Sequence, residues 1–518
     1  MPKARTYYGI KHWISDQLLF QKLNSPLGYS LLTVLALALA YLMAEWDYTF
    51  GILLLALLLG LPLAVMCIFD QVFGLSVILL TAVGVGWATK FIPGPIGTSL
   101  DILLFIMFFG LLLKQVKERD FAFARSPISF FVLMWVFYNL LEVLNPWADS
   151  RLAWFFTVRS MAGLILLYFV ACYAFSNLRA IVWLLKLILA AALVSALYGL
   201  KQEFFGFSAS EMAWLYSDPE RFQLIFQWSR LRIFSFFSDP TNFGIFMSYS
   251  ATLCLVLASG PFKIWQRLVL LGSAFCMILA MAYAGSRTPF ILLPVGLIFF
   301  ALLTLKRNVL IAMGFFFVLG SALMLKSTSS AVIYRIQSAF DLSKSDDTVK
   351  VRLDNQKYIQ PFIHRHPFGA GLGATGIWGK RFSPQNKLAN FAHDSGFVRI
   401  AVELGWIGLI LYCAFLFVVL RTTIYYFLRV RDPKIKTVYL GLATIFFQLT
   451  LANYPQEALV VLPTSIIFYI TLAMSARLKD FDGQWTSTEV KAGRNIPGIP
   501  FFSGRDNILD DPTFRHKS

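Results

Sequence analysis

Arginine side chains recur at four separated points of the chain where apolar segments meet polar ones: Arg159, Arg232, Arg287 and Arg352. Arg159 lies inside an apolar run, where an arginine marks a ligand pathway or a paired charge unless it reaches out to the lipid headgroups. A guanidinium binds phosphate through paired hydrogen bonds and keeps its charge at every relevant pH. We expect the four to converge on a diphosphate. Taken singly, each could equally contact a lipid headgroup or form an ion pair.

His393 and Asp394 form a second chemical element in the segment AHDSGFVRIAVELGWIGL. A histidine titrates near neutrality, so His393 could act as general base toward a sugar hydroxyl. Asp394 could orient His393, compete with it as the base, or simply cap the helix that follows. Arg399 is a further candidate for substrate binding. It also has the i,i+4 spacing to Glu403 of an ordinary salt bridge.

The remaining histidines and the glycine-rich segment HPFGAGLGATG carry less chemistry. His364 and His366 have no second set of ligands nearby in sequence, so we predict no metal site and no cofactor. Gly369, Gly371 and Gly373 have no βαβ pattern around them, which argues against a nucleotide-binding fingerprint. Glycines at this spacing permit a tight backbone path close to a ligand or to the membrane surface.

The chain that must position these residues is strongly apolar. Of its 518 residues, 58% are hydrophobic and only 14% are charged, which indicates lipid as the main solvent. We predict an all-α, polytopic integral membrane protein with about 14 transmembrane helices. The expected centres are Leu37, Leu58, Leu79, Phe105, Leu133, Leu164, Leu187, Ser250, Leu271, Pro294, Phe316, Leu411, Ile445 and Ile467. The five cysteines all fall within these spans, so we expect no disulfide.

The positions of the basic residues predict the topology. With the N-terminus inside, every clearly basic short connection lies on the cytoplasmic side, as the positive-inside rule requires. This pattern explains much of the net charge of +17 without any nucleic-acid partner. Both termini are then cytoplasmic, and the candidate site faces outward. The basic residues concerned are Lys3, Arg5, Lys11, Lys114, Lys117, Arg119, Arg125, Arg179, Lys263, Arg267, Lys306, Arg307, Arg421, Arg429, Arg431, Lys434, Lys436, Arg477 and Lys479.

Three regions follow from this topology. Residues 1–27 form an interfacial cytoplasmic helix, 28–479 the transmembrane domain and 480–518 a disordered cytoplasmic tail. Two long loops, about 201–240 and 327–396, lie outside.

Each long loop contains one predicted helix. In the first, Asp218-Pro219-Glu220 has the form of a helix start, and the helix continues through Trp228. In the second, a helix begins after Asp346 and Asp347 and ends at HPFGAGLGATG.

The motifs, in their order, resemble the O-antigen ligase and O-antigen polymerase superfamily of bacterial membrane glycosyltransferases. The matching stretches are RIFSFFSDPTNFG, the pair Ser286-Arg287, Arg352 followed by HPFGAGLG, and AHDSGFVRIAVELGWIGL. The resemblance implies metal-independent transfer of a glycan from undecaprenyl diphosphate to a glycan or glycolipid hydroxyl, at the periplasmic face of the inner membrane. Membrane lipids and a chain-length regulator or export complex are the further partners it implies. By position, His393 activates the acceptor, while Arg159, Arg232 and Arg287 hold the diphosphate.

Two departures from the ligase pattern favour a repeat-unit polymerase over a ligase. Ligases usually show His-Asn where this chain has His393-Asp394, and the spacing from His393 to Gly405 is one residue longer. In polymerase-type members the residue aligned with the histidine varies, so Asp394 stays a competing base. The alternative from another class is a lipid-linked oligosaccharide flippase or other exporter. We see no internal repeat of the kind that transporters show.

Overall fold

The computed structural model describes residues 60–90, 97–227, 230–307, 309–311, 347–391, 393 and 395–485, with isolated residues in 25–41 and 314–337. The chain divides into two units, Met1–Phe69 and Asp70–Ser518. In the first unit, Gly60–Phe69 is a short apolar helix. The predicted helix at 1–27 lies outside the described residues apart from isolated positions. Of the predicted tail 480–518, only residues 480–485 are described, and Leu478–Phe481 form a 3-10 helix at its start.

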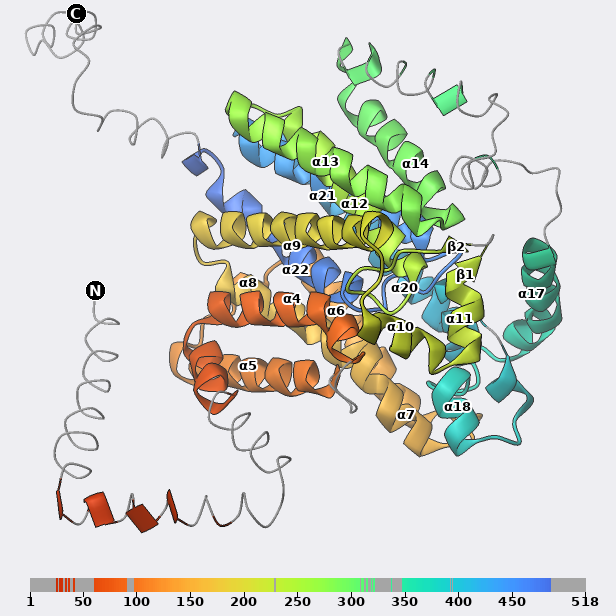
Figure 1. Cartoon of the computed structure of the whole chain (residues 1–518). Coiled ribbons are helices and arrows are strands. Elements are labelled where there is room, and N and C mark those ends of the chain that lie inside the picture. Colours follow the sequence, from red (N-terminus) through yellow and green to blue (C-terminus); the bar gives the residue numbers. More distant parts are fainter. Residues whose placement is uncertain are drawn as a thin grey trace, which may run out of the picture. The chain divides into compact units, whose positions relative to one another are not determined.

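The second unit is built of helices in the part of the chain that the structure describes, with one two-stranded ribbon (Figure 1). The all-α prediction is therefore confirmed for these residues. The long apolar helices are α4 (Gln71–Ala88), α5 (Gly97–Glu118), α6 (Pro127–Leu141), α9 (Leu178–Phe204), α12 (Pro240–Ala258), α13 (Ile264–Ala284), α14 (Arg287–Thr304), α20 (Gly405–Arg429), α21 (Pro433–Ala452) and α22 (Thr464–Arg477), together with the pair α7 (Arg151–Val158) and α8 (Leu167–Ala174).

Ten helical segments of the described residues are long and apolar enough to cross a membrane, and each contains one predicted centre. The predicted centre Ile467 lies in α22, which has 14 residues. The centres at Leu58 and Phe316 lie outside the described residues, and around Leu37 only isolated residues are described. The multi-pass membrane character is confirmed, whereas the number 14 stays a prediction.

Polar caps set where several of these helices begin. Asp239 accepts hydrogen bonds from the backbone N–H groups at the start of α12, and Pro240 follows at the first helical position. Asp432 and Pro433 begin α21 in the same way, and Asn177 caps α9. These side chains satisfy N–H groups that have no partner inside the helix, which matters most where water is scarce.

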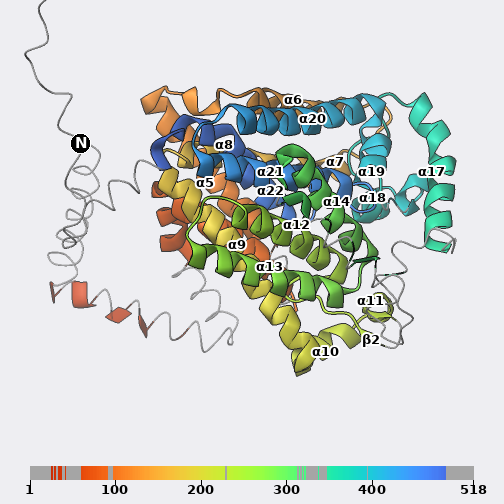
Figure 2. The ribbon, with the colours of Figure 1, turned by 90° about the horizontal axis from the view of Figure 1, so that it is seen from above.

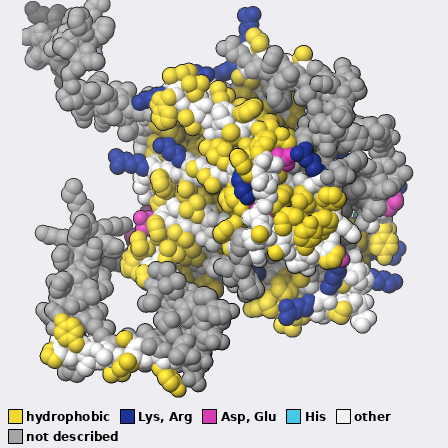
Figure 3. Space-filling model, in the orientation of Figure 1, with side chains coloured by type: hydrophobic (Ala, Val, Ile, Leu, Met, Phe, Trp, Pro, Cys, Tyr) yellow, Lys and Arg dark blue, Asp and Glu magenta, His cyan; other side chains and the backbone are white. Residues whose placement is uncertain are grey.

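Helices α12 and α21 form the centre of the second unit. Of their apolar windows, 83% and 78% of the residues are buried, against 33% for α13. α12 packs against α9, α13, α14 and α21, as Figures 1 and 2 show. The outer helices present hydrophobic side chains over much of the face seen in Figure 3, with Lys and Arg in scattered positions. Exposed Phe109, Phe137 and Leu428 are typical of a surface that lipid covers.

The polar connections gather at one end of this bundle. α10 (Ala209–Tyr216), α11 (Pro219–Ile225), the strands β1 (Phe226–Gln227) and β2 (Arg230–Leu231), α17 (Asp347–Arg365) and α18 (Gly376–Phe382) all lie there in Figures 1 and 2. α17 begins at Asp347, one residue earlier than predicted, and ends at Arg365, directly before HPFGAGLGATG as predicted. α11 begins at the predicted Asp218 cap but ends at Ile225, so its predicted extension to Trp228 is wrong. Phe226 leaves the helix because it pairs with Leu231 across the ribbon.

Candidate functional site

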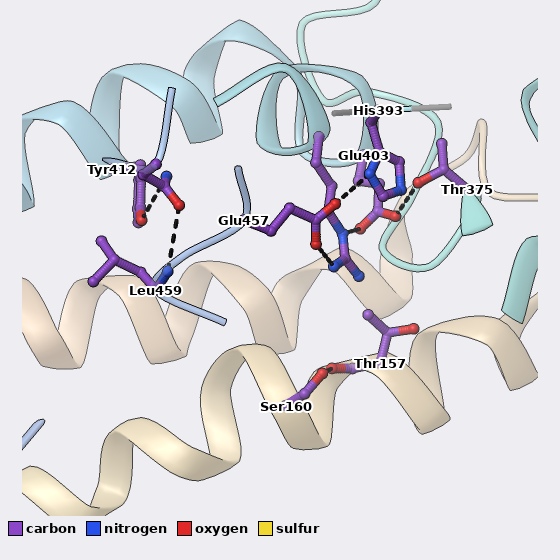
Figure 4. Close-up of polar contacts among 10 residues, drawn as sticks. Thr157, Ser160, Thr375, His393, Glu403, Tyr412, Glu457 and Leu459 are labelled. Atoms are coloured by element: carbon purple, nitrogen blue, oxygen red, sulfur yellow. Dashed lines mark hydrogen bonds and ion pairs between the residues drawn. The ribbon is translucent and has the colours of Figure 1, made fainter. Parts of the chain in front are cut away.

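His393 and Glu457 face one another at this polar end. His393 lies in the loop before α19 (Gly396–Glu403), and Glu457 lies in the connection between α21 and α22. Nδ1 of His393 contacts Oε1 of Glu457, and the two side chains are 14% and 19% exposed (Figure 4). The contact orients the imidazole ring, and the carboxylate favours the tautomer that carries its proton on Nδ1. Nε2 is then the nitrogen that can accept a proton from another molecule.

The pairing shifts the titration of both groups. Burial alone would lower the pKa of His393, but its hydrogen bond to Glu457 and the charge of that carboxylate raise the pKa above its ordinary value. Burial alone would raise the pKa of Glu457, but His393 and the charge of Arg399 hold it below its ordinary value. Both shifts favour the pair in which imidazolium faces carboxylate, so the pair stabilises a proton once Nε2 has accepted it.

The Nε2 edge of His393 lies over a glycine. A Cβ atom built on Gly376 would lie 3.5 Å from Nε2, and the glycine has φ +67°, a conformation that L side chains rarely adopt. The missing side chain keeps the first turn of α18 clear beside the basic nitrogen. A hydroxyl approaching Nε2 therefore meets backbone there instead of a side chain.

Arg399 joins the carboxylates of Glu457 and Glu403. Its guanidinium donates to Glu457 Oε2 at 2.6 Å and to Glu403 Oε2 at 3.4 Å, and its side chain is 14% exposed. The salt bridge expected from the i,i+4 spacing is confirmed. The hydroxyl of Thr375 donates to Glu403 at 2.5 Å, which extends the network to the glycine-rich segment. Arg399 thus holds Glu457 beside His393, while its predicted substrate contact stays a prediction.

Asn453 connects the two loops that carry the pair. Its carbonyl accepts the Gly396 N–H at 3.0 Å, and its side-chain amide donates to the hydroxyl of Tyr412 at 3.2 Å. Its side-chain oxygen accepts the Leu459 N–H at 3.5 Å (Figure 4). The end of α21 is therefore bonded to the start of α19, at a point four residues before Glu457. This brings His393 and Glu457 together although they are far apart in sequence.

The glycine-rich segment HPFGAGLGATG packs tightly against α19 and α7. The N–H groups of Ala370 and Gly371 donate to the carbonyls of Val402 and Glu403 at 2.9 and 3.0 Å. Gly373, with φ +81°, lies so close to α7 that a Cβ atom would meet the Ala153 carbonyl oxygen at 2.7 Å. The backbone path is tight, as predicted from these glycines, and the close contacts are with other helices. That the path also runs close to a ligand or to the membrane surface stays a prediction.

Arg159 follows directly after α7. It begins a π-helical turn, Arg159–Gly163, between α7 and α8, a feature that is frequent at functional sites. Its Nη1 pairs with Asp101 Oδ2 of α5 at 3.1 Å, and the side chains are 39% and 14% exposed. Arg159 is therefore a paired charge, one of the alternatives that its position suggested. α7 links it to the glycine-rich segment that faces His393.

Arg232 and Arg287 lie at a second corner of the same end. Arg232 is 7% exposed, and its Nε donates to the carbonyl of Ala284, the last residue of α13, at 2.9 Å. Arg287 is the exposed first residue of α14, after a turn in which Gly285 has φ +59°. The structure thus brings the segments of Arg232 and Arg287 together at the turn between α13 and α14.

The segment that follows Arg232 is held by buried polar groups. The side-chain oxygen of Gln202 accepts the N–H groups of Phe234 and Ser235 at 3.2 and 2.7 Å. Lys90 Nζ donates to the Ser235 carbonyl at 3.0 Å and lies 4.2 Å from the centre of the Phe234 ring. Burial lowers the pKa of Lys90 to about 7. These contacts fix the backbone of RIFSFFSDPTNFG before α12 begins.

Two predicted residues cannot be placed. Asp394 and the side chain of Arg352 lie outside the described residues, although the backbone of Arg352 belongs to α17. Ser395 caps α19 through a hydrogen bond from the Val398 N–H at 3.5 Å. The interpretation of Asp394 as a cap concerns a residue outside the described part of the chain.

Sequence reasoning missed Glu457 and Asp101. Two signals were available in the sequence. Asp101 is an acidic residue inside the apolar run of α5, and Glu457 is one between two apolar helices. Within the described residues, no three His, Cys, Asp or Glu side chains come together as a metal-binding group.

The chain was compared with curated proteins and with models of protein families. No curated protein matches the chain. A family model described as O-antigen ligase matches residues 272–413, a region that contains Arg287, His393, Arg399 and Glu403. This match confirms the resemblance of the protein to the O-antigen ligase and O-antigen polymerase superfamily.

Proposed function

We propose that this protein is a membrane glycosyltransferase of surface polysaccharide assembly. It transfers a glycan from a polyprenyl-diphosphate carrier to a hydroxyl of a glycan or glycolipid acceptor. The observation that carries the proposal is the pair His393–Glu457, held by Arg399 at the polar end of an apolar helical bundle. The O-antigen ligase match over residues 272–413 supports the same class of chemistry.

His393 is the general base in this proposal. As the acceptor oxygen bonds to the anomeric carbon of the donor sugar, Nε2 takes the hydroxyl proton. The bond from that carbon to the diphosphate oxygen breaks, and the diphosphate leaves with the electron pair. Glu457 stabilises the imidazolium that results, because its carboxylate contacts Nδ1. Attack from the side opposite the leaving group inverts the anomeric centre.

Arginines stabilise the leaving diphosphate. Negative charge grows on the bridging oxygen in the transition state, and fixed guanidinium groups in a site of low dielectric stabilise it without reorganising. Arg159, Arg232 and Arg287 supply this charge, with Arg352 as a fourth candidate. Support comes from the 39% exposure of Arg159 and from the shared corner of Arg232 and Arg287. The proposed reaction requires no metal ion.

The protein acts, in this proposal, in the inner membrane of a bacterium with both termini in the cytoplasm. The site faces the periplasm, where the carrier-linked glycan is presented. His393-Asp394 in place of His-Asn favours a repeat-unit polymerase over an O-antigen ligase.

Transfer by the purified protein tests this function. We expect product from a polyprenyl-diphosphate-linked glycan and an acceptor glycan in the presence of a chelator. His393→Ala should lower the rate by about 10²–10⁴-fold, the usual contribution of a general base. His364→Ala, a histidine exposed on α17, is the matched control and should keep full activity. An undiminished rate in His393→Ala would refute the assignment of the base.

A further inference from the structure

A cavity of about 380 Å³ opens between α17, α19 and the first turns of α20. Figure 2 shows α17 beside α19, and α17 packs against both α19 and α20. Pockets that bind small ligands begin at about 300 Å³, so the space accommodates part of a substrate. We call it the α17 groove. The residues lining it are Gln356, Lys357, Ile359, Gln360, Ile363, Ser395, Phe397, Val398, Ala401, Leu409 and Tyr454.

The walls of the α17 groove are apolar and border the lipid-facing surface. Ile363, Val398 and Leu409 line it, and Leu409 belongs to α20, one of the helices that can cross a membrane. Near Leu409 on the same helix, Trp406 and Ile410 are 43% and 60% exposed. A hydrocarbon chain is the apolar ligand available beside such a helix.

The α17 side of the groove carries polar side chains. Gln356, Lys357 and Gln360 lie on α17 within about one turn of one another. Gln356 and Lys357 offer hydrogen-bond donors and one positive charge to a headgroup. Lys357 is the one cation among the described residues that line the groove. Among the described side chains that line the groove there is no guanidinium group, whereas the diphosphate donor is assigned to arginines.

The α17 groove adjoins the loops that carry the base. Ser395 and Tyr454 line it, and they lie two residues after His393 and three before Glu457 in sequence. In the proposed function, His393 must reach the acceptor hydroxyl, so a lipid bound here brings its glycan toward the base.

We propose that the α17 groove binds the hydrocarbon chain of a lipid-linked acceptor, with the headgroup at Gln356 and Lys357. This inference rests on the proposed function, because it assigns one of that reaction's two substrates to a place. The donor is assigned to the arginines. The acceptor occupies the groove because the groove carries one cation and adjoins the base.

Filling the mouth of the groove tests the assignment. Gln360→Trp places a large side chain there, whereas Asp354→Trp places the same side chain on the opposite face of α17, outside the groove. Both positions are exposed, so both variants should fold. For a lipid-linked acceptor, KM should rise about tenfold in Gln360→Trp, which corresponds to the loss of about two buried methylene groups. Asp354→Trp should match wild type.

The same glycan without its lipid chain is the second substrate of the test. Its KM should be equal in wild type and Gln360→Trp, because it has no chain to place in the groove. If Gln360→Trp instead raises KM for the donor, the donor chain occupies the groove and the proposal is wrong. Unchanged constants for both lipid-linked substrates would also overturn it.

Photo-crosslinking separates this inference from the proposed function. An acceptor lipid with a diazirine in its chain should label α17 in the wild-type protein, with labelling reduced at least about fivefold in Gln360→Trp. Labelling of α17 without any glycosyl transfer would leave the groove assignment standing and refute the function. Labelling that an unglycosylated phospholipid abolishes with equal potency would show a general lipid site and overturn the proposal.

Discussion

Replacing Glu457 with Gln removes the charge beside His393 while keeping the size of the side chain. Neutral His393 is the form that accepts the proton, so the transfer rate in wild type rises with pH through the pKa of His393. The contact with Glu457 holds that pKa above its ordinary value. In Glu457→Gln the pKa falls, and the acidic limb of the rate profile should move to lower pH.

The maximal rate should fall at the same time. A carboxylate that orients a histidine and stabilises its protonated form accounts for part of the rate enhancement of about 10²–10⁴-fold that a general base contributes. We expect kcat to decrease about 10²-fold, which corresponds to about 2.7 kcal/mol of transition-state stabilisation. Arg399 loses its charged partner at 2.6 Å but keeps Glu403 at 3.4 Å. The free energy of unfolding should therefore fall by about 1–3 kcal/mol.

The assay measures kcat of the purified protein from about pH 5.5 to 9, the range in which histidine titrates. Glu220→Gln, the same change at an exposed carboxylate on α11, is the control and should leave the profile unchanged. Thermal unfolding in detergent confirms that the variant is folded at the assay temperature. An acidic limb at the wild-type pH in Glu457→Gln would refute the pairing as the origin of the raised pKa.

Three further predictions follow from the site. Arg287→Ala should abolish glycan elongation while the protein still inserts, as immunoblots of membranes can show; normal glycan would contradict the role assigned to this arginine. Gly373→Ala should destabilise the protein by about 1–3 kcal/mol because of its positive φ and its contact with α7, whereas Gly272→Ala, with nothing within 4 Å, should be neutral or stabilising in thermal unfolding. The pair His393–Glu457 should stabilise the protein most at mildly acidic pH. The stability from the raised pKa of His393 is complete below about pH 6.5, and it is lost as the pH rises through the pKa of His393 in the folded protein. The stability from the lowered pKa of Glu457 is lost as the pH falls through the pKa of Glu457 in the folded protein. The melting temperatures of wild type and His393→Ala, compared across pH, should therefore differ most in that range.

The helical architecture was largely predictable because it depends on local sequence. Long apolar blocks indicate where helices lie, and caps such as Asp239-Pro240 indicate where they begin. The end of α11 was not predictable, because Phe226 leaves the helix to pair with Leu231, and the apolar pattern of the segment suits either structure. The π-helical turn at Arg159 also leaves the hydrophobic pattern unchanged.

The candidate site was predictable only in part. The loop position of His393 and the i,i+4 pair of Arg399 and Glu403 are local features. Glu457 was not found, because its relation to His393 depends on contacts made by Asn453 between α21 and α19. Asp101 was not found either, because its ion pair with Arg159 joins two helices that are distant in sequence. Sequence spacing cannot predict such contacts between distant segments.

The central claim is glycosyl transfer from a lipid carrier with His393 as base, and the lipid-linked glycans of a deletion strain test it most directly. The strain is complemented with wild type, His393→Ala or the control His364→Ala. The account predicts that single repeat units accumulate on the polyprenyl carrier at the outer leaflet without the protein and with His393→Ala, and that long polymer returns with wild type and His364→Ala. Full-length polymer retained on the carrier would identify a ligase instead. Lipid-linked units held only at the cytoplasmic leaflet would contradict the account, because they indicate a transporter.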